Sequence, residues 1–191
     1  TTVTRTFNIA GACNPENHFT ANVQEKLDRV LDLISKGNYF TINKPRQYGK
    51  TTLMHFLENQ LSQDETYLAL GISFEEIDAS SFKNQEWFIT TFFDILKEQL
   101  EFLKEVQLLS MVETYLDSKE YIPTFKRLDM FLTKLIAASG RKVVMMIDEV
   151  DKACNDQLFL DFLGMLRSKY LKRNQRKGHT FLSVILAGVH D

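Results

Sequence analysis

The sequence predicts a three-layer α/β/α fold with a mainly parallel sheet, in one domain over residues 1–191. First, short apolar runs alternate with longer segments of helical periodicity, which implies strands joined by helical crossovers. Second, Val143–Ile147 has no polar residue, as is typical of a central parallel strand covered on both faces. Third, 44% hydrophobic and 25% charged residues exclude a disordered chain, a collagen-like repeat and a disulfide scaffold.

The elements can be assigned in order along the chain. Residues 1–19 have no clear period and are expected to be an extended lead-in. Apolar residues recurring every three or four positions predict helices over about 20–36, 50–61, 87–103, 107–116, 125–139 and 158–171. Compact apolar runs predict strands over 39–42, 67–74, 143–147 and 181–187. Gly37 and Gly140 follow two of the helices and supply stop signals. Residues 43–49 are expected to form a polar loop.

Net charge, cysteine content and hydropathy limit the partners and the cellular compartment that we expect. The net charge of −2 gives no global reason to expect nucleic acid or membrane as a partner. No apolar run approaches the roughly 20 residues that a membrane helix needs. Cys13 and Cys154 are far apart, so we expect two reduced thiols in a cytoplasmic protein. Asp191 directly follows an apolar run, and we therefore expect a further C-terminal portion that would complete the sheet edge.

Residues 44–51 lie between a predicted strand and a predicted helix and match the P-loop pattern at all but the first position. Such a loop points backbone N–H groups at phosphates, with a helix N-terminus behind them. Gly49 lets the backbone approach the phosphates, and Lys50 can reach the β- and γ-phosphates of ATP. Thr51 can place its hydroxyl on Mg²⁺, and Thr52 is a further contact.

The loop departs from the usual pattern at its start. Lys44 stands where the first glycine is usual, and Pro45 has no N–H to donate. Gln47, Tyr48 and Gly49 remain as backbone donors for a nucleotide. An ordinary strand–helix turn with a surface lysine is the alternative, since a bare Gly-Lys-Thr tripeptide is a weak signal.

The second part of a nucleotide site follows the apolar strand 143–147. Asp148 ends this strand and could hold Mg²⁺ through a water. Glu149 comes next and is placed to orient and polarise an attacking water. The alternative is that both merely begin an acidic turn before Asp151. Two independent motifs in the right order favour the nucleotide site.

The order of the segments predicts the branch of P-loop NTPases. A strand at 67–74 lies between the phosphate loop and the acidic strand, and the glutamate directly follows the aspartate. Both features resemble the additional-strand, catalytic-glutamate type. In that type the strand at 181–187 would lie between the strands at 39–42 and 143–147. A sensor of the γ-phosphate would follow it, with His190 and Asp191 as candidates, although a plain turn would look the same.

Four segments closely resemble the bacterial and archaeal AAA-ATPase-like domain family. They are Phe7–Phe19, Phe40–Thr52, Phe162–Arg167 and Ser183–Val189. In that family a basic residue commonly replaces the first P-loop glycine, so Lys44 fits. The resemblance implies ATP binding, a fold like the AAA and STAND ATPases, and a C-terminal PD-(D/E)XK nuclease-like domain in the intact protein.

The resemblance gives two further residues a candidate role. Phe19 would lie beside the adenine, although a hydrophobic staple on the first helix explains it equally well. Arg167, or Arg173 on the same helix, would be an arginine finger that offsets the charge developing on the transferred phosphate, and a neighbouring subunit of an oligomer would complete that site. Basic residues crowd the stretch 167–177, and cations favoured at a helix C-terminus are the simpler explanation.

Three functions remain open at this point. The leading one is an ATPase or ATP-dependent switch that binds Mg-ATP and hydrolyses it slowly for an attached domain. The second is a nucleotide-gated interaction module without useful turnover, which the presence of Glu149 disfavours. The third is a nucleic-acid-binding module that uses the basic stretch 167–177.

Overall fold

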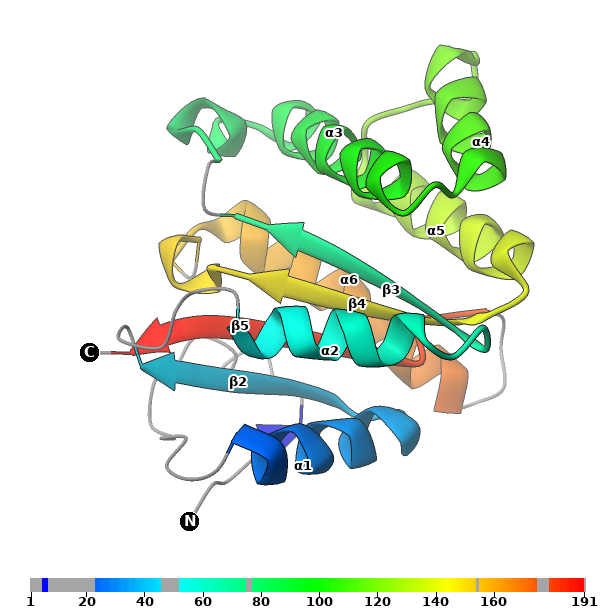
Figure 1. Cartoon of the computed structure of the whole chain (residues 1–191). Coiled ribbons are helices and arrows are strands. Elements are labelled where there is room, and N and C mark those ends of the chain that lie inside the picture. Colours follow the sequence, from blue (N-terminus) through cyan, green and yellow to red (C-terminus); the bar gives the residue numbers. More distant parts are fainter. Residues whose placement is uncertain are drawn as a thin grey trace.

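A computed structural model describes residues 5–6, 23–45, 52–74, 77–153, 155–174 and 179–190 (Figure 1). The helices are α1 (Val23–Ser35), α2 (Thr52–Ser62), α3 (Gln85–Phe102), α4 (Val106–Asp117), α5 (Phe125–Ser139) and α6 (Gln157–Asn174). The strands are β1 (Arg5–Thr6), β2 (Tyr39–Pro45), β3 (Tyr67–Ser73), β4 (Lys142–Asp148) and β5 (Ser183–His190). Two 3₁₀ turns, η1 (Ala79–Phe82) and η2 (Val150–Lys152), follow β3 and β4.

The strands form one sheet in the order β1-β2-β5-β4-β3. β2, β5, β4 and β3 are parallel, and β1 pairs antiparallel with β2. β5 therefore lies between β2 and β4, which confirms the predicted α/β fold with the last strand inserted between the other two. The carboxyl ends of the four parallel strands meet at one edge of the sheet, and this edge carries the candidate site.

Two strand ends and one additional strand are the main differences from the sequence-based expectation. β2 continues through Pro45, where a loop was expected from residue 43, because Asn43–Pro45 stay in register with Gly188–His190 of β5. β5 likewise runs on to His190 instead of ending at 187. β1 was not expected at all, since two residues carry no periodicity and only the pairing of Arg5 with Thr41 and of Thr6 with Phe40 defines the strand.

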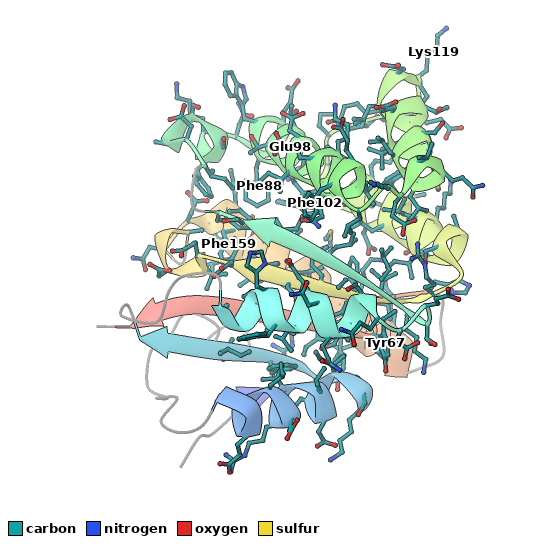
Figure 2. All side chains as sticks on the ribbon, viewed as in Figure 1. Tyr67, Phe88, Glu98, Phe102, Lys119 and Phe159 are labelled. Carbon is teal, nitrogen blue, oxygen red and sulfur yellow. The ribbon has the colours of Figure 1, made fainter. Side chains whose placement is uncertain are left out.

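The two faces of the sheet bury different cores. On one face, α1 and α2 pack with Phe40, Val144 and Ile185 in the smaller cluster. On the other face, α3, α5 and α6 pack with the strands in a larger, phenylalanine-rich cluster. Phe88 and Phe159 belong to that cluster, where rings such as Phe88–Phe162 approach to 5.6 Å between centroids (Figure 2). Most described phenylalanines are thus core residues, as expected, and Phe102 is an exposed exception.

Helix boundaries follow local signals in the sequence. The side chain of Asn84 accepts a hydrogen bond from the Trp87 N–H and starts α3, and Thr124 does the same for α5 through Arg127. Gly140 ends α5 with φ of 62°, a left-handed conformation that glycine adopts without strain. No helix in the described ranges has both the length and the apolar character to cross a bilayer.

Candidate functional site

Asp148 is the last residue of β4 and lies at the carboxyl edge of the sheet. Its neighbour in register on β3 is Ser73, which is also the last residue of its strand. Side chains alternate along a strand, and Val144 and Met146 of β4 face the core beneath α1 and α2. Asp148 therefore projects on the α2 face, and Ser73 projects beside it. A carboxylate and a hydroxyl stand together where the phosphate loop was predicted to deliver its ligand.

The link from Asp148 to Glu149 is tightly constrained. The backbone N–H of Glu149 donates to Oδ1 of Asp148 at 2.8 Å, which fixes the orientation of that carboxylate. Glu149 has φ of 58° and ψ of 38°, the left-handed region that costs a non-glycine residue roughly 1–2 kcal/mol. Its side chain is only 4% exposed. A strained, buried glutamate directly after the strand-end aspartate is the kind of outlier that concentrates at functional sites.

Glu58 of α2 is a third carboxylate near this edge, and the sequence analysis missed it. Its Oε1 lies 2.6 Å from the position that a Cβ on Gly71 of β3 would occupy, so α2 and β3 approach closely here. Burial raises the pKa of Glu58, the charge of Asp148 raises it further, and His55 lowers it. A signal was present: Glu58 stands at i+4 from Met54, within the apolar stripe of α2 that packs on the sheet.

The predicted phosphate loop is only partly described. Lys44 and Pro45 form the end of β2, and Thr52 is the first residue of α2. The strand and the helix therefore flank residues 46–51 as the P-loop pattern requires. Gln47, Tyr48, Gly49, Lys50 and Thr51 lie outside the described residues, as do Phe19, Asp191, Cys13 and Cys154. Their predicted roles stay predictions.

The strand between the two halves of the site is β5. It separates β2 from β4, so the end of β4 lies two strand spacings, roughly 10 Å, from the end of β2. Gly188 of β5 packs against η2, where an added Cβ would lie 3.4 Å from Val150 Cγ2. His190, a predicted sensor, is the last residue of β5 rather than part of a turn after it.

The basic stretch on α6 is not one uniform cationic surface. α6 runs away from the carboxyl edge, so Arg167 lies roughly 15 Å along the helix from its start. The side chain of Arg167 is exposed. The structure thus does not bring Arg167 to Asp148 in the same chain. Lys169 is only 3% exposed and pairs with Asp129 of α5 at 2.8 Å, so this member of the stretch is used inside the protein. Arg173 also lies on α6.

The donor chemistry at the edge suits Mg²⁺. This cation prefers hard oxygen ligands and usually keeps several waters, with one or two carboxylates and substrate phosphates completing its shell. Asp148 and Ser73 are such oxygen donors on neighbouring strand ends. Among the described residues, no group of three His, Cys, Asp or Glu side chains forms a metal cluster.

The chain is similar in sequence to a family of known domains. The sequence profile of the AAA-like domain family matches residues 15–190. Among solved structures, the Aeropyrum pernix ORC2 protein, described as ADPNP-ADP complexes, is similar with a TM-score of 0.48 and 13% identity. The similarity covers 86% of this chain and 40% of that one, so this chain spans less than half of that protein. No curated protein matches by sequence.

Proposed function

Since the chain belongs to the AAA-like domain family, we propose that it binds Mg-ATP at the carboxyl edge of the sheet and hydrolyses it slowly. The observation that carries this proposal is the pairing of Asp148 with a strained, buried Glu149 at the end of β4. One strand, β5, lies between β4 and β2, and β2 leads into the predicted phosphate loop. A nucleotide in that loop would have both carboxylates on the side of its terminal phosphate.

Each residue has a defined task in this proposal. Lys50 neutralises the β- and γ-phosphates, and the N–H groups of residues 47–51 cradle them. Thr51 and Asp148 would hold Mg²⁺, which draws charge from the phosphates when bound. Glu149 would accept a proton from the attacking water. Phe19 would stack on the adenine.

We assign the output of the cycle to a switch or motor role for an attached C-terminal domain. The exposed position of Arg167 on α6 suits an arginine finger directed at a neighbouring subunit rather than at its own site. A nucleotide-gated module without turnover is the second candidate, and the presence of Glu149, a candidate general base directly after Asp148, disfavours it.

A thermal shift assay with ATP and Mg²⁺ tests the proposal. ATP at 100 times its Kd should add about 2.7 kcal/mol to the free energy of unfolding. Lys50→Ala should remove most of that gain while leaving the ligand-free melting temperature unchanged. Lys119→Ala is the matched control, because Lys119 is exposed at the far end of α4 (Figure 2). An ATP-induced shift that persists in Lys50→Ala would contradict the phosphate-loop assignment.

A further inference from the structure

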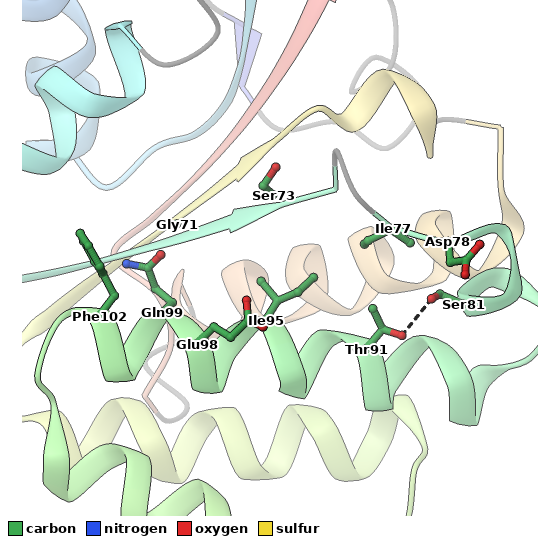
Figure 3. Close-up of a pocket in the computed structure, with 10 residues that line it drawn as sticks. All are labelled: Gly71, Ser73, Ile77, Asp78, Ser81, Thr91, Ile95, Glu98, Gln99 and Phe102. Atoms are coloured by element: carbon green, nitrogen blue, oxygen red, sulfur yellow. Dashed lines mark hydrogen bonds between the residues drawn. The ribbon is translucent and has the colours of Figure 1, made fainter.

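A groove of about 620 Å³ runs between the outer edge of β3 and one face of α3 (Figure 3). Gly71 and Ser73 line it from the strand, and Thr91, Ile95 and Gln99 line it from the helix. β3 is the last strand of the sheet, and β4 is its sole pairing partner within the described ranges. The groove therefore follows an edge strand.

The hydrogen bonds of β3 show which of its backbone groups face away from the sheet. The Lys142 N–H donates to the Thr66 carbonyl at 2.8 Å, and the Phe74 N–H donates to the Asp148 carbonyl at 3.1 Å. In a parallel pair, alternate residues turn both backbone groups to the same neighbour. The even-numbered residues of β3 thus face β4. Ala69 and Gly71 turn their N–H and C=O groups outward, and Gly71 does so in the groove.

These outward groups are available for pairing. The Tyr67 N–H, which also faces outward, is used by the Asp64 carbonyl at 3.1 Å. The backbone groups of Ala69 and Gly71 on this side form no hydrogen bond to any described residue. An edge with unpaired N–H and C=O groups is a template for an added strand. Gly71 has no side chain of its own, and Oε1 of Glu58 and Oε1 of Gln99 lie 2.6 and 3.4 Å from the position that its Cβ would occupy.

The opposite wall supplies apolar contact at one end. Phe102, on the last turn of α3, is 78% exposed, and its ring points toward the strand (Figure 3). Ile95 and Gln99 point into the same space from the middle of the helix (Figure 3). Thr91 is held by a 2.9 Å hydrogen bond to Ser81 of η1, which fixes the other end of the wall.

The charge of the lining is one-sided. Asp78 and Glu98 are both exposed members of the lining, and its described residues include no lysine or arginine. A segment that enters the groove is therefore favoured when it carries cations. The exposed ring of Phe102 favours apolar side chains between those cations.

We propose that this groove binds an extended segment of a partner protein as an additional strand on β3, with basic and apolar residues at every second position, on the face toward α3. The outward groups of Ala69 and Gly71 would pair with the backbone of that segment. Asp78 and Glu98 would select its basic side chains, and Phe102 would contact an apolar one. This site does not depend on nucleotide, so its test is independent of the test of the proposed ATPase activity.

The test uses a fluorescein-labelled heptapeptide with lysine and valine in turn at positions 1, 3, 5 and 7 and threonine between them, with fluorescence anisotropy as the readout at low ionic strength. A peptide with glutamate in place of lysine should bind at least tenfold more weakly. The lysine–valine peptide with all its backbone amides N-methylated should also lose at least tenfold, because its backbone can no longer pair. In ¹⁵N spectra, the unmodified peptide should slow hydrogen exchange of the Gly71 amide severalfold.

Charge-reversal variants test the acidic lining. Glu98→Lys should raise the Kd of the lysine–valine peptide about three- to tenfold, since an attraction becomes a repulsion. Glu101→Lys is the matched control on the same exposed helix surface outside the lining, and it should change the Kd less than twofold. Absent binding, equal binding of the N-methylated peptide, or equal effects of the two variants would overturn the proposal. Protection of Gly71 through self-association would identify a second copy instead and overturn the stated occupant.

Discussion

Two regions of this protein bury charge in opposite ways. Between α5 and α6, the buried Lys169 has polar partners: it forms an ion pair with Asp129 and donates a hydrogen bond to Thr133. At the carboxyl edge of the sheet, two like charges approach each other: burial raises the pKa of Glu58, and the charge of Asp148 raises it further. The first arrangement brings opposite charges together and stabilises the fold. The second disfavours the charged form of Glu58, so its purpose must be sought in binding and chemistry.

The sharpest test of this comparison is Glu149→Gln, for which we expect the largest effect. Glutamine keeps the shape of the side chain but cannot accept a proton, so ATP hydrolysis should fall about 10²–10⁴-fold. ATP binding, measured by thermal shift, should remain. Glu113→Gln on the exposed face of α4 is the control and should leave the rate unchanged. Wild-type turnover by Glu149→Gln would show that another group acts as the base.

The next largest effect is expected at the α5–α6 pair. Asp129→Asn leaves the Lys169 ammonium 3% exposed without its anion, which should lower the free energy of unfolding by about 3 kcal/mol. Lys172→Ala is the control, because Lys172 is mostly exposed and lies 3.6 Å from the same carboxylate. It should lose less than about 1 kcal/mol. Urea unfolding measures both.

A double variant separates charge balance from packing in the same region. Asp129→Leu combined with Lys169→Met removes both charges and should recover most of the stability lost in Asp129→Asn. If the double variant is as unstable as the single one, the pair contributes through its shape and not through its charges.

Much of the fold could be predicted from the sequence because its signals are local. The apolar run of β4 and the helical stripes of α3, α5 and α6 are readable in short windows. The insertion of β5 between β2 and β4 could also be predicted, from the order of the phosphate-loop and acidic motifs.

The rest depends on long-range pairing and burial. β1 and the extension of β2 through Pro45 exist because another strand lies alongside, which no local pattern records. Lys169 was counted among the basic surface residues, since only the packing of α5 on α6 shows that it is buried. Glu58 was overlooked because a glutamate in an apolar helical stripe gains meaning only when β3 and Asp148 are placed beside it.

A smaller effect is expected from the backbone of Glu149. Glu149→Gly should raise the free energy of unfolding by about 1 kcal/mol, because glycine adopts the left-handed conformation without strain and removes a buried carboxylate. Lys104→Gly is the matched control, since Lys104 has φ of 57° but an exposed side chain. If the buried carboxylate of Glu149 destabilises the fold in addition to its backbone conformation, Glu149→Gly should stabilise the protein more than Lys104→Gly does. Equal gains would assign the whole effect to the backbone.

The smallest effect concerns Glu58 and appears only as a pH dependence. Its pKa lies above the ordinary value of 4.5, first through burial, so the folded state favours the protonated carboxyl. The stabilisation linked to that protonation is fully present below pH 4.5 and is lost as the pH rises through the raised pKa of the folded state. Glu58→Gln resembles the protonated form at every pH. It should therefore be more stable than the wild type at pH 7, and this advantage should shrink as the pH falls through the raised pKa and be lost below about 4.5. Urea unfolding of both proteins across this range measures the difference, with Glu113→Gln as the exposed control. A constant difference at all pH values would mean that the Glu58 carboxyl is not under electrostatic stress, and the contrast between the two charged regions would then rest on Glu149 alone.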